Sequence, residues 1–164
     1  MHGGGQEREI RSGTLNAPAI VAFTAAAEVA IRDRTENFGR IRELRDYFID
    51  GLKRAVPDVH INSVADPALP GIVNATFPGT ESDALLLLLD SEGISCSAGS
   101  ACSAGVPRPS HVLVALGLSE TDADASLRIS IGTTNTKLEL DQVLKVLPSV
   151  VERARAAFVA SELV

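Results

Sequence analysis

Apolar residues recur every three or four positions between residues 36 and 55, which is the spacing of one face of an α-helix. This stripe consists of Phe38, Ile41, Leu44, Phe48 and Leu52. We expect a helix that buries the stripe and exposes the charged residues between its members, namely Arg40, Arg42, Glu43, Arg45, Asp46 and Asp50. Upstream, an Ala-rich stretch predicts another helix, because Asn16 is a good N-cap and Pro18 falls near the first turn.

The pattern changes after Pro57 to short apolar runs separated by Gly and Pro. Such runs are typical of β-strands. The strands predicted in this way lie at residues 59–64, 72–77, 94–97 and 127–131.

Longer apolar stretches predict helices at residues 84–89 and 110–116, and the second of these is ended by Gly117. A C-terminal helix is predicted from Leu138 onward, with a kink or a break at Pro148. The residues expected to begin a helix or a helical turn are Ser82 and Ser119. Helices and short strands in this order predict the α/β fold class, with helices packed on a small sheet.

Composition and charge limit the class of protein. The chain has 164 residues, 45% hydrophobic and 22% charged, which excludes intrinsic disorder as its main state. This length allows one domain, or one domain and a piece of another. A net charge of −6 argues against a nucleic-acid binder. We expect no membrane-spanning segment, because the longest helical apolar stretch is too short, and two cysteines fit a reducing, cytoplasmic setting.

Cys102 is the sharpest candidate for chemistry. It lies in the run SAGSACSAG, residues 97–105, where glycines and serines favour an exposed, flexible loop. Such a loop suits a nucleophilic thiol, although an inert cysteine in a loop is an equal alternative at this point. Cys96 lies in a strand-like stretch, and we expect it to be a small core or edge residue.

Two other kinds of site have weaker support. The residues Cys96, Cys102 and His111 are spaced irregularly, and no CxxC or HxxxH pair is present, so we expect no metal site. The segments HGGG, residues 2–5, and ACSAG, residues 101–105, are similar to hydrolase motifs. However, Ala101 occupies the position where the tight turn of a nucleophile elbow requires glycine, so a hydrolase is a minor alternative.

Arg128 lies in the predicted strand at residues 127–131, between Leu127 and Ile129. An arginine in an apolar strand is costly unless it has an anionic partner. That partner is either an internal Asp or Glu, or the carboxylate of an amino-acid substrate that the planar guanidinium binds through two hydrogen bonds. The residues alone leave both alternatives open.

Five segments together resemble the cysteine desulfurases, pyridoxal-phosphate enzymes of the class V aminotransferase type. The segments are HGGGQEREIRSGT (2–14), LPGIVNATFPG (69–79), GISCSAGSACSAG (93–105), PSHVLVALGL (109–118) and LRISIGTTNT (127–136). Their order and spacing match over nearly the whole chain. The loop at residues 98–102 resembles the long-loop branch, which supplies sulfur for iron–sulfur clusters and other acceptors.

The resemblance implies roles for four residues. Cys102 matches the cysteine that becomes a persulfide, and Arg128 matches the arginine that binds the substrate α-carboxylate. Thr14, in RSGT, matches a threonine that reaches across a homodimer to the pyridoxal phosphate of the other subunit. Asn74 matches a small-domain asparagine, which we assign to substrate binding. In the family, sulfur moves from L-cysteine to the cysteine, L-alanine is released, and an iron–sulfur scaffold or another acceptor protein takes the sulfur.

The chain departs from the family pattern in one important respect. The lysine that binds pyridoxal phosphate covalently lies upstream of HGGG in the family, and Lys53, Lys137 and Lys145 match no such site. We therefore expect a C-terminal portion of a fold-type I enzyme, in which Met1 is an internal methionine. Residues 1–35 would be the end of the large domain and the start of the connecting helix, and residues 36–164 the small α/β domain with the cysteine loop. Alone, the chain is expected to be inactive, and a non-enzymatic sulfur carrier or docking domain is the alternative.

Overall fold

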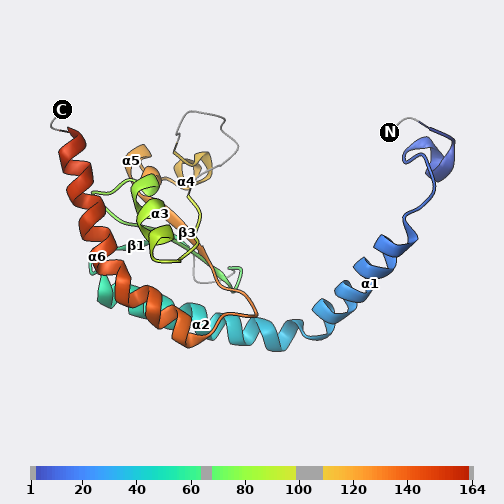
Figure 1. Cartoon of the computed structure of the whole chain (residues 1–164), viewed down its shortest axis with the longest axis horizontal. Helices are drawn as coiled ribbons and strands as arrows, with labels where there is room; N and C mark the ends of the chain where they lie inside the picture. The colour runs from blue at the N-terminus through green and yellow to red at the C-terminus, as the bar shows by residue number, and fades with distance from the viewer. Residues whose placement is uncertain (1–2, 64–67, 99–108, 163–164) are drawn as a thin grey trace. The chain divides into compact units, whose positions relative to one another are not determined.

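The computed structural model describes residues 3–63, 68–98 and 109–162 (Figure 1). Contacts divide the chain into two compact units, Met1–Asn37 and Phe38–Val164. No helix in the part of the chain that the structure describes has both the length and the apolar character needed to cross a membrane. The elements, in chain order, are η1 (Gln6–Glu9), α1 (Ala17–Arg32), α2 (Arg34–Ala55), β1 (His60–Ile61), β2 (Ile72–Thr76), α3 (Ser82–Ser91), α4 (His111–Ala115), α5 (Glu120–Asp124), β3 (Ser126–Ser130) and α6 (Lys137–Glu162).

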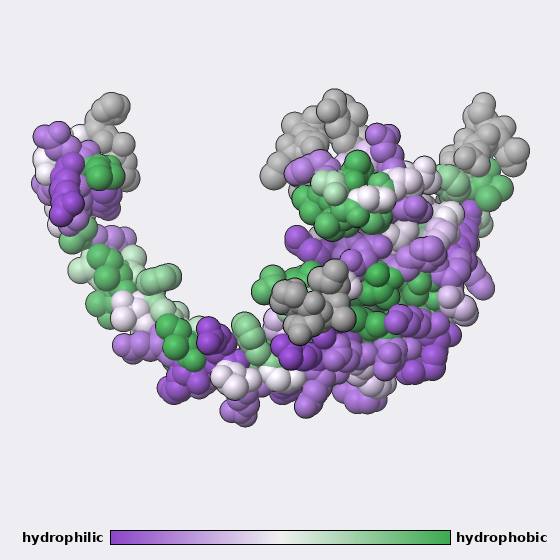
Figure 2. Space-filling view, turned by 180° about the vertical axis from the view of Figure 1, so that it is seen from behind, coloured by the Kyte–Doolittle hydropathy of each residue, from purple (hydrophilic) through white to green (hydrophobic). Residues whose placement is uncertain are grey.

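The first unit is built on α1, which begins where the sequence predicts. The Oδ1 atom of Asn16 accepts a hydrogen bond from the backbone N–H of Ala19 at 3.2 Å, and Pro18 occupies the first turn. The structure buries no residue of α1, and large apolar side chains, including Val21 and Phe23, remain exposed. Figure 2 shows apolar residues distributed along this helix.

The second unit contains an antiparallel sheet with the strand order β1–β2–β3. Because side chains alternate along a strand, Val73 and Ala75 share one face with Leu127. This face belongs to the core, which also contains residues of α2, α3 and α6, among them Ile41, Phe48, Leu52, Leu85, Leu89, Leu147, Val150 and Val151. The opposite face of the sheet is mostly polar: Asn74 and Thr76 lie there beside Ser126 and Arg128.

The stripe predicted along α2 is buried at Ile41, Phe48 and Leu52, whereas Phe38 is 43% exposed. The expectation that Arg45 is exposed is wrong. Arg45 is buried, and its Nε and Nη2 atoms both donate to Oδ1 of Asp46, at 2.8 and 2.7 Å. A guanidinium paired in this way at the edge of a core can bury its aliphatic stem while its charge stays compensated.

Three further expectations need correction. Of the predicted strand at residues 94–97, only Ser97 pairs, as an isolated bridge to Arg128. Glu81 occupies the N-cap position of α3, so Ser82 is the first helical residue. Of the kink or break expected at Pro148, the structure excludes the break, because α6 continues through this residue. Buried contacts of Leu147, Val150 and Val151 on either side of the proline hold α6 together despite the missing backbone hydrogen bond.

The remaining short elements agree with the sequence. Helix α4 follows Ser110 and is ended by Gly117, whose φ of 97° is easily reached only by glycine. The acidic turn is the helix α5, and Ser119 caps it by accepting a hydrogen bond from the backbone N–H of Asp122 at 3.0 Å.

Candidate functional site

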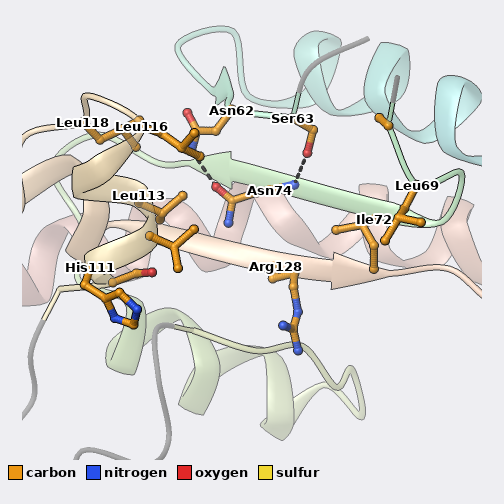
Figure 3. A pocket seen from close by; sticks show the side chains of 13 residues that line it. Asn62, Ser63, Leu69, Ile72, Asn74, His111, Leu113, Leu116, Leu118 and Arg128 are labelled. Atoms are coloured by element: carbon orange, nitrogen blue, oxygen red, sulfur yellow. Dashed lines mark hydrogen bonds between the residues drawn. The ribbon is translucent and has the colours of Figure 1, made fainter. Parts of the chain in front are cut away.

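A pocket of about 670 Å³ lies over the polar face of the sheet (Figure 3). Its apolar lining comes from the residues before β2 and from α4 and the residues that follow it, and includes Leu69, Leu113 and Leu116. Its polar lining comes mainly from the sheet and the residues just after β1: Asn62, Ser63, Asn74 and Arg128, with His111 at the start of α4. The pocket therefore combines apolar walls with a strip of polar groups that crosses the sheet.

Asn74 is hydrogen-bonded through its backbone and its side chain. Its backbone N–H donates to Ser63 Oγ at 2.7 Å, and its backbone oxygen accepts from Asn62 N–H at 2.8 Å. Asn74 Oδ1 accepts from Asn62 Nδ2 at 2.7 Å, and Asn74 Nδ2 donates to the Leu127 carbonyl at 3.2 Å. Two of these bonds are drawn in Figure 3. Asn74 thus connects the end of β1 with β3.

Arg128 lies opposite Asn74 in the register of β2 and β3. Its backbone is fixed on the other side, since Arg128 N–H donates to Ser97 O at 2.7 Å and Ser97 N–H donates to Arg128 O at 3.0 Å. The side chain is exposed and extends away from Asn74 (Figure 3). Within the described residues it makes no hydrogen bond or ion pair, so neither Asp nor Glu there occupies the guanidinium.

Cys102 lies outside the described residues, so the structure places only the chain leading toward it. Ser97, the partner of Arg128, is five positions before Cys102 in the sequence. The bridge therefore places the arginine beside Ser97, in the last described stretch before Cys102 in the sequence.

Cys96 matches the expectation of a small packing residue. It is partly buried and packs against the core cluster. Burial raises the pKa of the Cys96 thiol from 9.0 to about 11, because the thiolate loses solvation. At neutral pH Cys96 is therefore a protonated and weakly reactive thiol. No group of three or more His, Cys, Asp or Glu residues in the described ranges is arranged to hold a metal ion.

Thr14 follows a tight turn in the first unit. Nη1 of Arg11 donates to the carbonyl oxygens of Gly13 and Thr14 at 3.0 and 2.8 Å, and Gly13 N–H donates to Gln6 Oε1 at 3.0 Å. Gly13 has a φ of 93°, a conformation that glycine adopts readily. Thr14 itself is exposed, and its hydroxyl has no hydrogen-bond partner among the residues described. The turn therefore presents a free hydroxyl group.

None of the three lysines lines the pocket. Lys137 Nζ donates to Tyr47 Oη at 2.8 Å and to Asp141 Oδ2 at 3.0 Å, while Lys53 and Lys145 are exposed on α2 and α6. The pocket groups fit the carboxylate of a small anionic ligand, because the guanidinium of Arg128 has no partner among the residues that the structure describes. They do not fit the covalent attachment of an aldehyde cofactor, which requires an amine.

Sequence reasoning identified Asn74 and Arg128 but missed Asn62 and Ser63. Asn62 and Ser63 stand directly after the short apolar run of β1, at the point where polar residues replace apolar ones. The change of polarity is visible in the sequence, but the position of Asn62 opposite Asn74, with Ser63 next to it, depends on the strand register. That register is determined only in the folded sheet.

The fold and the pocket together define an α/β unit with Arg128 in the lining of a partly apolar pocket. A family model described as aminotransferase class-V matches residues 3–143, and the chain belongs to this family. An IscS-like cysteine desulfurase from Mycobacterium tuberculosis is 49% identical over 162 residues, which cover 98% of this chain and 41% of that protein. Cysteine desulfurase IscS 1 from Archaeoglobus fulgidus is 43% identical over 154 residues, 94% of this chain and 40% of that protein.

Solved structures give the same result for the fold. A NifS-like protein from Rickettsia africae matches with a TM-score of 0.80 and 32% identity, over 93% of this chain and 39% of that chain. A second NifS-like protein matches with a TM-score of 0.79 and 33% identity. The α/β fold and the resemblance to cysteine desulfurases are confirmed. The chain spans about two fifths of the length of the curated relatives described here.

Proposed function

We propose that this chain forms the part of a cysteine desulfurase that accepts sulfur on Cys102 and binds the substrate carboxylate at Arg128. The observation that carries the proposal is the free guanidinium of Arg128, exposed beside the pocket and without a carboxylate partner among the described residues. An unpaired arginine in a partly apolar pocket is suited to bidentate binding of a carboxylate. The similarity to cysteine desulfurases supports L-cysteine as the ligand whose carboxylate binds there.

The proposed role of Arg128 is to orient L-cysteine. The guanidinium takes the α-carboxylate, and the sheet fixes the arginine backbone through Ser97. Holding one end of a small substrate directs its side-chain sulfur and lowers the entropic cost of reaction. Asn74, which we assigned to substrate binding from the resemblance, is proposed to contribute to the same site.

The proposed role of Cys102 is nucleophilic. Its thiolate attacks the sulfur of L-cysteine, a sulfur–sulfur bond forms, and the carbon–sulfur bond of the substrate breaks. The electron pair of the broken bond remains with the carbon skeleton, which takes up a proton and leaves as L-alanine. Pyridoxal phosphate, when bound, supplies the electron sink for this chemistry.

Further contributions are proposed from the family. Thr14 offers its free hydroxyl to the phosphate of the cofactor bound by the other subunit of a homodimer, and the covalent lysine comes from an N-terminal portion of the enzyme. An iron–sulfur scaffold or another acceptor protein takes the sulfur from Cys102, in the cytoplasm. The lining of the pocket supports this division of labour, because it includes Arg128 and no lysine.

The test uses the pyridoxal-phosphate enzyme that contains this chain and measures sulfide release from L-cysteine with a thiol reductant. Arg128→Ala is expected to raise KM for L-cysteine about ten- to hundred-fold, because a charge-assisted hydrogen bond contributes roughly 1.5–3 kcal/mol. KM for L-cysteine methyl ester, which lacks the carboxylate, should change little. Arg42→Ala, at an exposed position of α2, is the matched control and should leave both values unchanged.

Cys102→Ala separates the proposed function from its alternative. The desulfurase proposal predicts loss of sulfide release and of the 32 Da persulfide adduct formed on this chain from L-cysteine, a mass increase of about one sulfur atom. If the unaltered enzyme forms no adduct from L-cysteine but accepts sulfur from a persulfide donor, the chain is a sulfur carrier. Unchanged KM for L-cysteine in Arg128→Ala would contradict the carboxylate site.

A further inference from the structure

We propose that Asn62 is a positioning residue for Arg128, acting through the side chain of Asn74. The inference rests on the proposed function, because it concerns how the carboxylate site is held in place. It assigns a role to a residue that lies outside the motifs that suggested the site. A continuous series of hydrogen bonds crosses the sheet from Asn62 to β3.

Asn62 is bound to Asn74 twice. Its backbone N–H donates to the Asn74 carbonyl at 2.8 Å, which continues the pairing of β1 with β2 beyond Ile61. Its Nδ2 atom donates to Asn74 Oδ1 at 2.7 Å. The second bond fixes which way the Asn74 carboxamide is turned, because it commits the carboxamide oxygen toward β1 (Figure 3).

The orientation of the Asn74 carboxamide determines its contact with β3. With Oδ1 held by Asn62, the Nδ2 atom of Asn74 points to β3 and donates to the Leu127 carbonyl at 3.2 Å. The peptide group that contains this carbonyl also contains the N–H of Arg128. That N–H in turn donates to Ser97 O at 2.7 Å. Asn62, Asn74, the Leu127–Arg128 peptide and Ser97 are therefore linked in one row of hydrogen bonds.

In this row each polar group of Asn74 already has a partner within the protein, although its Nδ2 atom carries a second hydrogen. Its backbone N–H, backbone oxygen, Oδ1 and Nδ2 all have protein partners, with the N–H bound by Ser63 Oγ at 2.7 Å. By contrast, the guanidinium of Arg128 is free within the described part of the chain. The geometry favours different roles for these residues: Arg128 binds the carboxylate, and the two asparagines hold the Leu127–Arg128 peptide group in place.

A second branch of the network provides an internal control. Asn62 Nδ2 also donates to Thr76 Oγ1 at 2.8 Å, and the Thr76 and Ser126 hydroxyls lie 2.7 Å apart. This branch is buried and leads away from Arg128, toward the backbone oxygen of Asp122. Removing the Thr76 hydroxyl therefore disturbs the same network without cutting the row that leads to Arg128.

The experiment compares Asn62→Ala, Asn62→Asp and Thr76→Val in the pyridoxal-phosphate enzyme that contains this chain. Asn62→Asp keeps the size of the side chain but replaces the donor to Asn74 Oδ1 by an oxygen, so it also serves if the alanine variant does not fold. Each variant is assayed with L-cysteine and with L-cysteine methyl ester. The proposal predicts a three- to ten-fold rise in KM for L-cysteine with both Asn62 variants, little change in kcat, and no equivalent change for the ester.

Thr76→Val is expected to lower thermal stability but to leave both KM values unchanged. The double variant Asn62→Ala/Asn74→Ala should show no larger rise in KM than Asn74→Ala alone, because the two residues act in series. Unchanged KM in the Asn62 variants, with a raised KM in Arg128→Ala, overturns the inference and leaves the proposed function intact. Unchanged KM in Arg128→Ala overturns both.

Discussion

Ser97 and Arg128 exchange two backbone hydrogen bonds, at 2.7 and 3.0 Å, although no regular strand contains Ser97. In an antiparallel pair, the N–H and C=O of one residue point to the same neighbour, so Arg128 directs both groups away from β2. The candidate carboxylate site is thereby attached to the segment that leads to Cys102. One pair of residues thus ties the proposed binding group to the chain that carries the proposed nucleophile.

Replacing Ser97 by proline removes one of these bonds, because proline has no N–H. In the 164-residue chain, we expect the amide of Arg128 to exchange about five-fold faster with solvent deuterium, because the neighbouring hydrogen bond that is lost is worth about 1 kcal/mol. Ser97→Ala keeps the backbone donor and should leave exchange unchanged. The measurement is amide hydrogen exchange by NMR, and equal protection in the two variants would show that the bridge does not restrain Arg128.

Gly71, directly before β2, is a second test of how the sheet is assembled. A Cβ atom added at Gly71 would overlap the carbonyl oxygen of Ile131, and this backbone is already tied there, since Ile131 N–H donates to Gly71 O at 2.7 Å. Gly71→Ala is therefore expected to lower the free energy of unfolding by about 1–3 kcal/mol. Urea denaturation followed by circular dichroism measures the change.

Gly39→Ala is the matched control for Gly71→Ala. Gly39 is an exposed residue of α2, and an added Cβ there meets no atom within 4 Å. The substitution should raise the free energy of unfolding by up to about 1 kcal/mol, because alanine favours the helix. A Gly71→Ala variant as stable as the unaltered chain would mean that the Gly71–Ile131 contact can relax.

The helices were the most predictable part of the fold. Apolar residues spaced three or four positions apart predicted α2, the capping residue Asn16 predicted the start of α1, and Gly117 predicted the end of α4. These signals are local, so they can be recognised without knowing the fold. Arg45 shows their limit: its charge suggested exposure, but its pairing with Asp46 allows it to be buried.

The sheet was less predictable, because pairing depends on contacts between distant residues. The apolar run at 94–97 has strand-like composition, yet only Ser97 pairs with β3. The rest of this run and the residues Ile129 and Ser130 both line a cavity of about 420 Å³. For the candidate site, the resemblance to the desulfurases pointed to Arg128 and Asn74. Asn62 became visible only through the register that places it opposite Asn74.

Cys96 allows a prediction from its raised pKa. With a pKa of about 11 instead of 9.0, the thiolate population at pH 7.5 is about a hundred-fold lower than for an unshielded thiol. In a Cys102→Ser variant, where Cys96 is the remaining cysteine, alkylation by iodoacetamide should be slow in the folded chain and rise about a hundred-fold in urea. Intact-mass spectrometry follows the reaction, and equal rates in the two conditions would contradict the shielding of Cys96.

The same pKa predicts how Cys96 affects stability at alkaline pH. Between about pH 9 and pH 11, the thiol of the unfolded chain loses its proton while the folded chain keeps it, so proton release favours unfolding. The chain that keeps Cys96 is compared with Cys96→Ala, both in the Cys102→Ser background. Any stability that Cys96 adds in this comparison is therefore complete below pH 9 and decreases as the pH rises toward 11. Urea denaturation of the two variants at pH 8 and pH 10.5 measures the difference between their free energies of unfolding. The other titrating groups are the same in both variants, so their contributions cancel in this difference. A difference that stays constant between these pH values would place the pKa of folded Cys96 at its ordinary value and remove the physical basis for its low reactivity.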